Sequence, residues 1–205
     1  MNEELKNILE RVYKLYQKYG IKSVTMDDVA HELGISKKTL YQYVADKKDL
    51  VSKIADLKVE FSAEHNRMLS QTTLNAIEEL VFVYRFLNRM LKDHNPSMMF
   101  DLKKYYPDIF EKLVIIRRKM IFEGMMHNLT KGQKEGYYRE NFDPEIIAKL
   151  HVLRIESLVD SDMFTKEDFM SEKVFIELFN YHLRGIASEK GLKYFVEEFN
   201  ELKPE

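Results

Sequence analysis

The densest group of side chains that could do chemistry lies between residues 36 and 47, where lysines, hydroxyl groups and a glutamine alternate with apolar residues. An ammonium group pairs with a phosphate oxygen, and a carboxamide can hydrogen-bond the edge of a nucleobase with both of its polar atoms. At about 100° per residue, Lys38 and Gln42 fall on the helix face opposite Leu40 and Val44. The pattern predicts a short helix that is held by its apolar side and offers its polar side to a nucleic acid.

Two short helices joined by a tight turn are expected to position this polar face. Thr25 can cap the first helix, with Asp28 three residues later placing a negative charge in the first turn. Gly34 can end that helix, because glycine adopts the left-handed conformation without a Cβ penalty. Ser36 can cap the second helix. Helices this short do not persist alone, so the pair reads as a helix-turn-helix, a motif that most often enters the DNA major groove.

This segment resembles the N-terminal DNA-binding region of the TetR family of bacterial transcriptional regulators. The family pattern runs Gly, a short gap, Thr-x-x-x-Ile-Ala, then Gly-Val-Ser-x-x-x-Leu-Tyr-x-Tyr-Phe-x-x-Lys-x-x-Leu. The chain matches it at Gly20, Thr25, Val29, Ala30, Gly34, Ile35, Ser36, Leu40, Tyr41, Tyr43, Lys47 and Leu50, with Val29 and Val44 in place of Ile and Phe. The resemblance covers about the first quarter of the chain.

Helix geometry places Lys38 and Gln42 toward base edges and Tyr41 and Lys47 toward phosphates, and the family pattern implies the same division. We therefore expect double-stranded operator DNA as a partner. The predicted DNA-binding residues are Thr25, Ser36, Lys37, Lys38, Thr39, Tyr41, Gln42, Tyr43 and Lys47.

The titratable residues give little support to catalysis. The chain has no cysteine, which removes disulfides, thiolate metal ligands and cysteine nucleophiles. A di-iron carboxylate site needs a glutamate three residues before a histidine, and the nearest approach is Asp28 before His31. His31-Glu32 is followed by Ile35 where a zinc protease needs histidine. The sequence also lacks a Gly-x-Ser-x-Gly element and a glycine-rich phosphate loop. We expect no enzyme, no catalytic residue, no metal and no cofactor.

Composition favours an all-α protein. With 205 residues, 45% of them hydrophobic, the chain can bury a full core. Seven glycines and four prolines leave little room for a loop-rich β architecture. The first residues are acidic where a signal peptide would be basic, and no apolar run approaches membrane-spanning length. We expect a cytoplasmic protein with no membrane partner.

The net charge of −2 does not by itself suggest a nucleic-acid partner. Its distribution is more informative, because residues 36–53 carry five lysines against two aspartates. A small protein that touches phosphates needs only such a local basic face.

Apolar periodicity and caps predict nine or ten helices. The first, near 2–19, and the helix-turn-helix pair form a DNA-binding domain over 1–50. A connector helix over 46–69 leads into a larger ligand-binding and dimerisation domain over 51–205. In that domain we expect Thr72 or Thr73 to cap the next helix, which runs to Lys92. Further helices are expected near 97–104, 108–134, 144–159 and 166–188, and a last one after Gly191.

Methionines and aromatic residues crowd the middle of the larger domain. Eleven methionines is a high number, and thioethers beside aromatic faces suit a cavity that adapts to varied ligands. Relatives in the resembled family bind small molecules between the central helices of this region. The alternative is ordinary core filling. The candidate ligand-binding residues are Met90, His94, Met98, Phe100, Tyr105, Phe122, Met125 and Met126.

Two later helices have apolar residues around more than half of their circumference, so one side can face the body and the other a partner. The alternative is that both sides are internal core. A symmetric four-helix bundle of two chains would pair two DNA-reading heads. The candidate dimer residues are Ile147, Leu150, Leu153, Arg154, Val174, Leu178, Tyr181 and His182.

These patterns together predict a homodimeric, TetR-like transcriptional regulator. The prediction is a repressor that binds a palindromic operator and is released by a small apolar or amphipathic effector. The alternative is a helical ligand-binding or scaffold protein of the same fold that has lost specific DNA binding.

Overall fold

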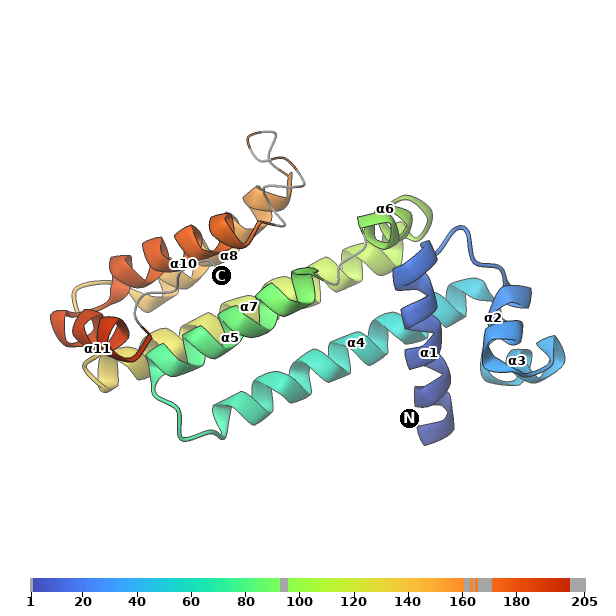
Figure 1. Ribbon diagram of the computed structural model, residues 1–205, viewed down its shortest axis with the longest axis horizontal. Helices are drawn as coiled ribbons and strands as arrows, with labels where there is room; N and C mark the ends of the chain where they lie inside the picture. Colours follow the sequence, from blue (N-terminus) through green and yellow to red (C-terminus); the bar gives the residue numbers. More distant parts are fainter. Residues whose placement is uncertain (1, 93–95, 161–162, 164, 166–170, 200–205) are drawn as a thin grey trace. The chain divides into compact units, whose positions relative to one another are not determined.

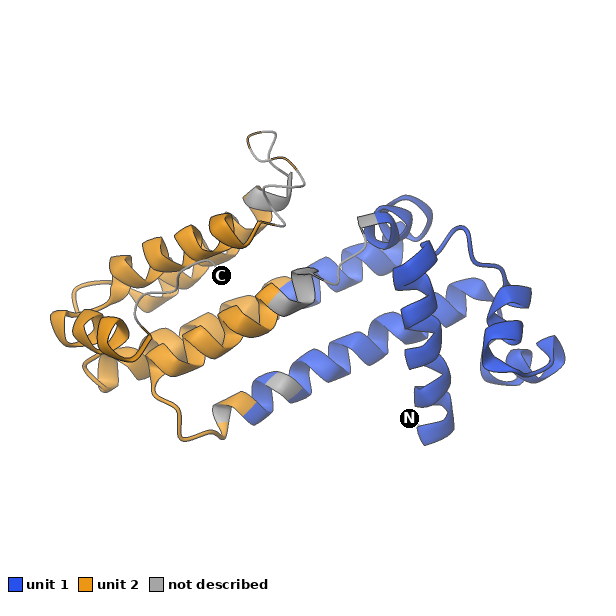
Figure 2. Cartoon of the chain, in the orientation of Figure 1, with its two compact units in different colours: residues 1–68, 94–117 blue, residues 69–93, 118–205 orange. Residues whose placement is uncertain are grey.

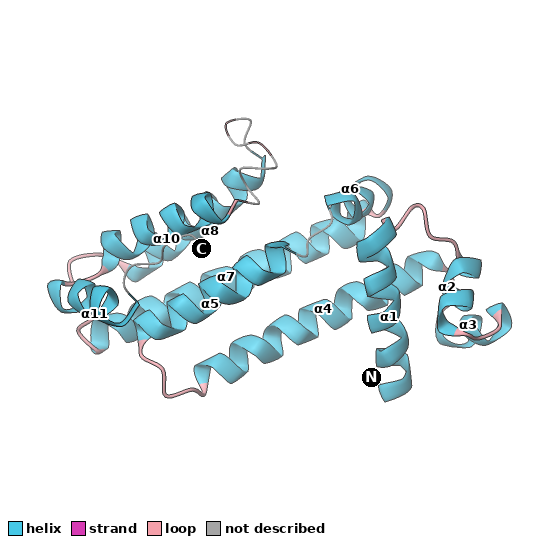
Figure 3. Ribbon diagram, in the orientation of Figure 1, coloured by secondary structure: helices cyan, strands magenta, loops and turns pink. Residues whose placement is uncertain are grey.

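The chain folds as an all-α protein, as predicted (Figures 1 and 3). The computed structural model describes residues 2–92, 96–160, 163, 165 and 171–199. Ten helices and no strand occur in these residues. The helices are α1 (Glu3–Tyr19), α2 (Met26–Leu33), α3 (Lys37–Tyr43), α4 (Lys47–Ser70), α5 (Ala76–Lys92), α6 (Pro96–Tyr105), α7 (Pro107–Lys134), α8 (Pro144–Asp160), α10 (Glu172–Ile186) and α11 (Glu189–Phe199).

The chain forms two compact units, coloured separately in Figure 2. Unit 1 comprises residues 1–68 and 94–117, and unit 2 comprises residues 69–93 and 118–205. This grouping describes which residues pack together, whereas the predicted division at residue 50 concerns where DNA and ligand bind. The predicted division therefore stays a prediction.

Unit 1 is built around a core that α1, α2, α3 and α4 share with α6 and the start of α7. Leu9, Val12, Val29, Leu40 and Leu50 are fully buried in it. Apolar residues at helical spacing place this face of each helix inward, and each large aliphatic side chain so buried contributes about 1.5–3 kcal/mol. The recognition pair is thus fixed to a rigid core.

Unit 2 has a second core formed by α5, α7, α8, α10 and α11. Its fully buried residues include Ile77, Leu129, Leu183 and Phe195. Tyr84 packs its ring against Phe179, with the two ring centroids 4.9 Å apart. Such aromatic pairs add to the free energy of burial.

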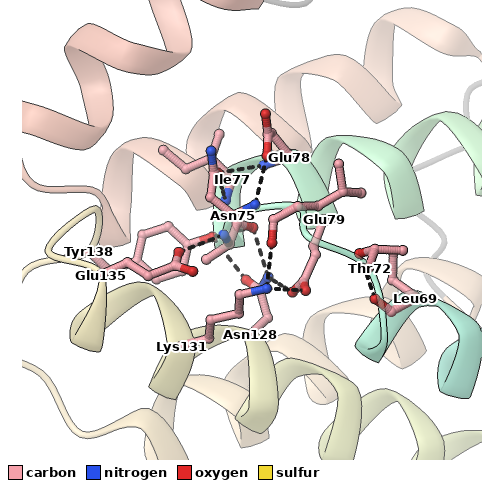
Figure 4. A network of polar contacts seen from close by, with 12 residues as sticks. Leu69, Thr72, Asn75, Ile77, Glu78, Glu79, Asn128, Lys131, Glu135 and Tyr138 are labelled. Carbon is pink, nitrogen blue, oxygen red and sulfur yellow. Dashed lines mark hydrogen bonds and ion pairs between the residues drawn. The ribbon is translucent and has the colours of Figure 1, made fainter.

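The start of α5 is joined to the end of α7 by a buried polar network (Figure 4). Lys131 Nζ pairs with Glu79 Oε1 at 2.5 Å and also donates to the carbonyl of Leu74. Asn128 donates to the carbonyl of Ala76 at 2.8 Å, and the Tyr138 hydroxyl donates to Asn128 Oδ1 at 2.9 Å. Burial raises the pKa of Tyr138 well above its usual value. Breaking this network would leave buried polar groups unpaired, which is costly.

Two details of the predicted helix boundaries were wrong. The cap of α5 is Asn75, whose Oδ1 accepts the amides of Ile77 and Glu78, and not Thr72 or Thr73. Gly191 does not precede the last helix but lies within α11, where a Cβ would come 2.0 Å from the carbonyl oxygen of Tyr137. Its role is close packing.

The helix predicted near 108–134 is α7, which ends after Lys134, with Gly136 left-handed at φ 74°. Asp143 caps α8, because its Oδ1 accepts the amide of Glu145 at 2.8 Å. In the described part of the chain, no helix is both long and apolar enough to cross a membrane.

Candidate nucleic-acid interface

Capping hydrogen bonds define both helices of the recognition pair. Thr25 and Asp28 form a reciprocal capping box at the start of α2, with Thr25 N donating to Asp28 Oδ2 at 2.8 Å. This bonding lowers the pKa of Asp28. Gly34 ends α2 in the left-handed region at φ 72°. Ser36 Oγ accepts the amide of Thr39 at 3.0 Å and starts α3. Since the Thr25 and Ser36 hydroxyls serve the caps, they determine where α2 and α3 begin.

The outward face of α3 is available to a ligand. Lys38 and Gln42 are exposed, and Tyr41 is 43% exposed, while Leu40 and Val44 are buried beneath them. Lys37 Nζ lies 3.0 Å from Asp27 Oδ2 in an exposed ion pair. Exposed pairs of this kind contribute little free energy, so a phosphate can compete for Lys37. Thr39 and Tyr43 are half-buried at the flanks.

Lys47 has a different environment from the one expected of a freely extended phosphate ligand. Its Nζ donates to the carbonyl of Val24 at 2.5 Å and to that of Lys22 at 3.4 Å. Burial lowers the pKa of this ammonium. The side chain therefore ties the start of α4 to the loop that precedes α2. Its predicted contact with phosphate stays a prediction.

The same loop is held from the other side by α6. Asp101 is buried, with 8% of its surface exposed, and its Oδ2 accepts the backbone amide of Lys22 at 2.8 Å. Gly20 adopts φ 79°, and a Cβ there would come 3.0 Å from Asp101 Oδ2. The Lys22 residue is thus bound through its amide by α6 and through its carbonyl by α4.

Sequence reasoning missed three residues that position the recognition pair: Asp101, Arg11 and Lys53. The guanidinium of Arg11 donates to the last carbonyls of α2, those of Glu32 and Leu33. Lys53 Nζ donates to the Tyr43 carbonyl at the end of α3, at 3.0 Å. Cations at helix carbonyl ends are stabilising. Only Lys53 had a sequence signal, because it lies four residues after Asp49 and pairs with it at 2.6 Å.

The candidate ligand-binding residues fall in both units. In unit 2, Met125 is buried, and Phe122 and Met126 pack against the same core. In unit 1, Met98 packs against the core, whereas Phe100 and Tyr105 are 60% and 39% exposed. His94 and the side chain of Met90 lie outside what the structure describes.

An open groove of about 440 Å³ lies elsewhere in unit 1. Residues of α1, of the α2–α3 turn and of α3 line it, among them Glu3, Arg11, Leu33 and Tyr43. None of the candidate ligand-binding residues lines this groove.

The candidate dimer residues lie on α8 and α10 of unit 2. Leu150, Leu153 and Tyr181 are 55%, 57% and 77% exposed, although all three are large and apolar or aromatic. Ile147, Val174 and Leu178 are half-buried at the edge of this exposed face. The structure of one chain therefore does not place Leu150, Leu153 or Tyr181 in an internal core.

A cluster of nitrogen-bearing side chains lies under this face. The rings of His151 and His182 lie with their centroids 4.7 Å apart and their planes tilted by 51°, and a guanidinium nitrogen of Arg154 lies 3.0 Å from His151 Nδ1. Burial, then the neighbouring His182 and Arg154, lower the pKa of His151 to about 2. Burial and Arg154 lower the pKa of His182 to about 3. Both rings are therefore neutral at ordinary pH.

A family model described as bacterial regulatory proteins of the tetR family matches residues 8–54, which hold the capped pair and its supporting helices. The HTH-type transcriptional regulator YvaF of Bacillus subtilis is 26% identical over 190 residues, covering 90% of this chain and 96% of YvaF. These matches support the assignment of this chain to the TetR family. They support a DNA-binding transcriptional regulator rather than an enzyme, as the sequence led us to expect.

Two further similarities extend the comparison beyond the matched segment. The HTH-type transcriptional repressor KstR2 of Mycobacterium tuberculosis is 21% identical over 157 residues, covering 73% of this chain and 76% of KstR2. A transcriptional regulator from Cytophaga hutchinsonii has a solved structure with a TM-score of 0.68 and 18% identity, covering 91% of this chain and all of that one. The similarity in fold therefore extends over both units.

Proposed function

We propose that this TetR-family regulator is a repressor that binds a palindromic operator as a dimer and is released by a small apolar or amphipathic effector. The observation that carries the proposal is the exposed apolar face of α8 and α10. Monomeric proteins rarely leave several large apolar side chains together in water. A helix-turn-helix protein needs two copies to read two half-sites, so a second chain is the fitting cover for this face.

Unsatisfied polar atoms on α8 and α10 also support a second chain. In the described part of the chain, Arg154 Nε, His182 Nε2 and Asn180 Oδ1 are buried and lack a hydrogen-bond partner. Buried polar groups are normally paired. Polar groups of a second copy, arriving with the apolar cover, would supply the partners.

Light scattering of a Leu150→Glu variant tests the dimer. Because Leu150 is half exposed in the single chain, a charge there should leave the fold intact and yield a monomer with wild-type helicity by circular dichroism. The matched control is Ile115→Glu on α7 of unit 1, since Ile115 is 57% exposed and should leave the dimer unchanged. A wild-type chain that is monomeric at micromolar concentration would exclude the dimer.

Selection from randomised duplex DNA tests the operator. A dimer with two recognition helices should enrich inverted repeats whose half-site centres are about one helical turn apart, or a multiple of it. Enrichment of single half-sites would contradict the palindrome. A promoter that carries the selected site tests repression. The wild-type protein should silence this promoter, and a Gln42→Ala variant should not.

The effector proposal rests on unit 2, where Phe122, Met125 and Met126 combine aromatic and thioether surface. Such side chains suit apolar ligands of varied shape. KstR2, with a TM-score of 0.56 to this chain, is described as a ketosteroid transcriptional regulator. That description supports an apolar effector class for this chain and names no particular molecule.

A further inference from the structure

Exposed aromatic and lysine side chains of α6 lie beside the loop between α1 and α2. We call Lys22, Phe100, Lys104 and Tyr105 the α6 band. Lys104 Nζ lies 5.4 Å from the Phe100 ring centroid and 5.5 Å from that of Tyr105. Lys22 Nζ approaches the same Tyr105 ring at 5.1 Å. Two ammonium groups from distant parts of the sequence are therefore held around one exposed phenol ring.

The band presents more positive than negative charge. Lys103, also exposed, adds a third ammonium in the last turn of α6. Asp101 is the one acid in the sequence of α6. It is buried and its Oδ2 already accepts the amide of Lys22 at 2.8 Å. The exposed part of the band is thus a set of ammonium and hydroxyl donors that suits an anion.

The band is continuous with the predicted DNA face of unit 1. Lys47 Nζ, a predicted phosphate ligand, contacts the carbonyls of both Lys22 and Val24. Val24 directly precedes Thr25, the N-cap of α2. Contacts therefore lead without interruption from the start of α2, through Lys47 and Lys22, to Tyr105 and Lys104.

We propose that the α6 band binds phosphates of the DNA that flanks the sequence read by α3. The inference rests on the predicted use of α3 and Lys47 as the DNA face. Charge complementarity and continuity with that face favour duplex DNA over other anionic surfaces. Phosphate contacts carry no base preference, so the band lengthens the footprint on DNA without adding sequence specificity.

The test is the salt dependence of binding of a Lys22→Gln/Lys104→Gln variant to a fluorescein-labelled, mixed-sequence duplex, followed by anisotropy. The duplex should be about 40 base pairs long, so that flanking phosphates are present. Each lost phosphate contact lowers the slope of log K against log salt by about 0.9, so the variant should lose about 1.8 per bound chain. Lys22→Arg/Lys104→Arg should keep the wild-type slope.

The matched control is Lys119→Gln/Lys193→Gln, which removes the same charge from two exposed lysines of unit 2. Both pair only loosely with a glutamate, at 3.8 Å, and their replacement should leave the slope unchanged. Because lysines in the last turn of a helix also stabilise its carbonyl end, each variant needs wild-type helicity by circular dichroism. A smaller salt slope for Lys22→Gln/Lys104→Gln than for Lys119→Gln/Lys193→Gln supports the band. Equal slopes for these two variants overturn it.

Two further experiments test whether the band binds membranes instead of DNA and whether α3 contacts DNA. If the band variant keeps its DNA slope and instead loses binding to phosphatidylglycerol-containing vesicles, the band contacts membrane surfaces and the proposal is overturned. A Lys37→Gln variant tests α3 independently, because Lys37 is the α3 lysine for which a phosphate can compete with Asp27. A wild-type slope for Lys37→Gln beside a reduced slope for the band variant would contradict a phosphate contact by α3 and still support the band.

Discussion

Gln42 and Lys47 are five residues apart on the predicted DNA face, and the structure gives them different roles. Gln42 is exposed on α3 with no competing use in the described contacts, whereas Lys47 donates to two loop carbonyls. We expect Gln42→Ala to relax base preference by about 1–3 kcal/mol if its contact with a base is bidentate. Lys47→Ala should weaken binding to all sequences alike and lower the salt slope by about one.

Anisotropy titrations of both variants against a panel of operator variants would check this difference. Thermal unfolding is a needed companion measurement, because Lys47→Ala also removes hydrogen bonds that tie α4 to the α1–α2 loop. Identical behaviour of the two variants across the panel would contradict the assignment.

Local sequence was sufficient to predict the residues that begin and end the recognition helices. Thr25, Gly34 and Ser36 act on groups within five residues of themselves, so their residue types and spacing carry the information. Asp101 could not be found this way. Its partner, Lys22, is 79 residues away in the sequence, and only the packing of α6 against α1 brings the two together.

At the scale of single helices, the adjacent rings of His151 and His182 make the pairing of α8 with α10 sensitive to acid. An unfolded histidine has a pKa near 6.5, and the folded values are about 2 for His151 and about 3 for His182. The unfolded state therefore binds more protons below pH 6.5, and stability falls as pH falls. Above pH 6.5 this contribution is fully retained.

Urea unfolding at pH 7.5 and at pH 5 measures the effect. Each buried histidine should lower the free energy of unfolding by about 1.4 kcal/mol for each pH unit below 6.5. Together the two should lower it by several kcal/mol at pH 5. His151→Gln/His182→Gln should flatten the pH dependence. The exposed His127 provides the control, since His127→Gln should leave the dependence as in the wild type. A wild-type chain equally stable at both pH values would rule out this role.

Helix existence was more predictable than helix starts. The apolar stripes of α1, α5 and α10 repeat at helical spacing and predicted those helices directly. Asn75, and not Thr72 or Thr73, caps α5, and Glu79, which belongs to the buried network with Lys131, follows in the first turn of that helix. That network joins residues about fifty positions apart and leaves no mark in local sequence.

For the whole molecule, effector and operator must compete if the ligand acts by release. A tenfold loss of operator affinity requires the effector to distinguish the two states by about 1.4 kcal/mol. By linkage, operator DNA must weaken effector binding by the same factor. Calorimetry of an effector found by thermal-shift screening, with and without operator, measures both. Equal affinities would mean that no coupling exists.

Apolar pattern alone does not say which helices share a core. Met98 and Met125 have similar surroundings in the sequence, yet one packs in unit 1 and the other in unit 2. The same limit applies to α8 and α10. Periodicity shows that Leu150 and Tyr181 lie on apolar faces, but it does not show whether the same chain or a second chain covers them. The exposed fractions of these residues in the structure distinguish an uncovered face from an internal core.

Asp101 binds the amide of Lys22 and Lys47 binds its carbonyl. Hydrogen exchange at the Lys22 amide can therefore report local opening of the loop between α1 and α2. This amide hydrogen is bound by the buried Asp101 carboxylate, while the neighbouring Ser23 is exposed in the loop. Exchange of the Lys22 amide with deuterated solvent requires α6 to release the loop, so its rate reports how often this joint opens. Asp101→Asn, which keeps an acceptor but removes the charge, should speed that exchange while amides in the centre of α1 keep their protection. An unchanged Lys22 rate would show that other contacts keep the joint closed.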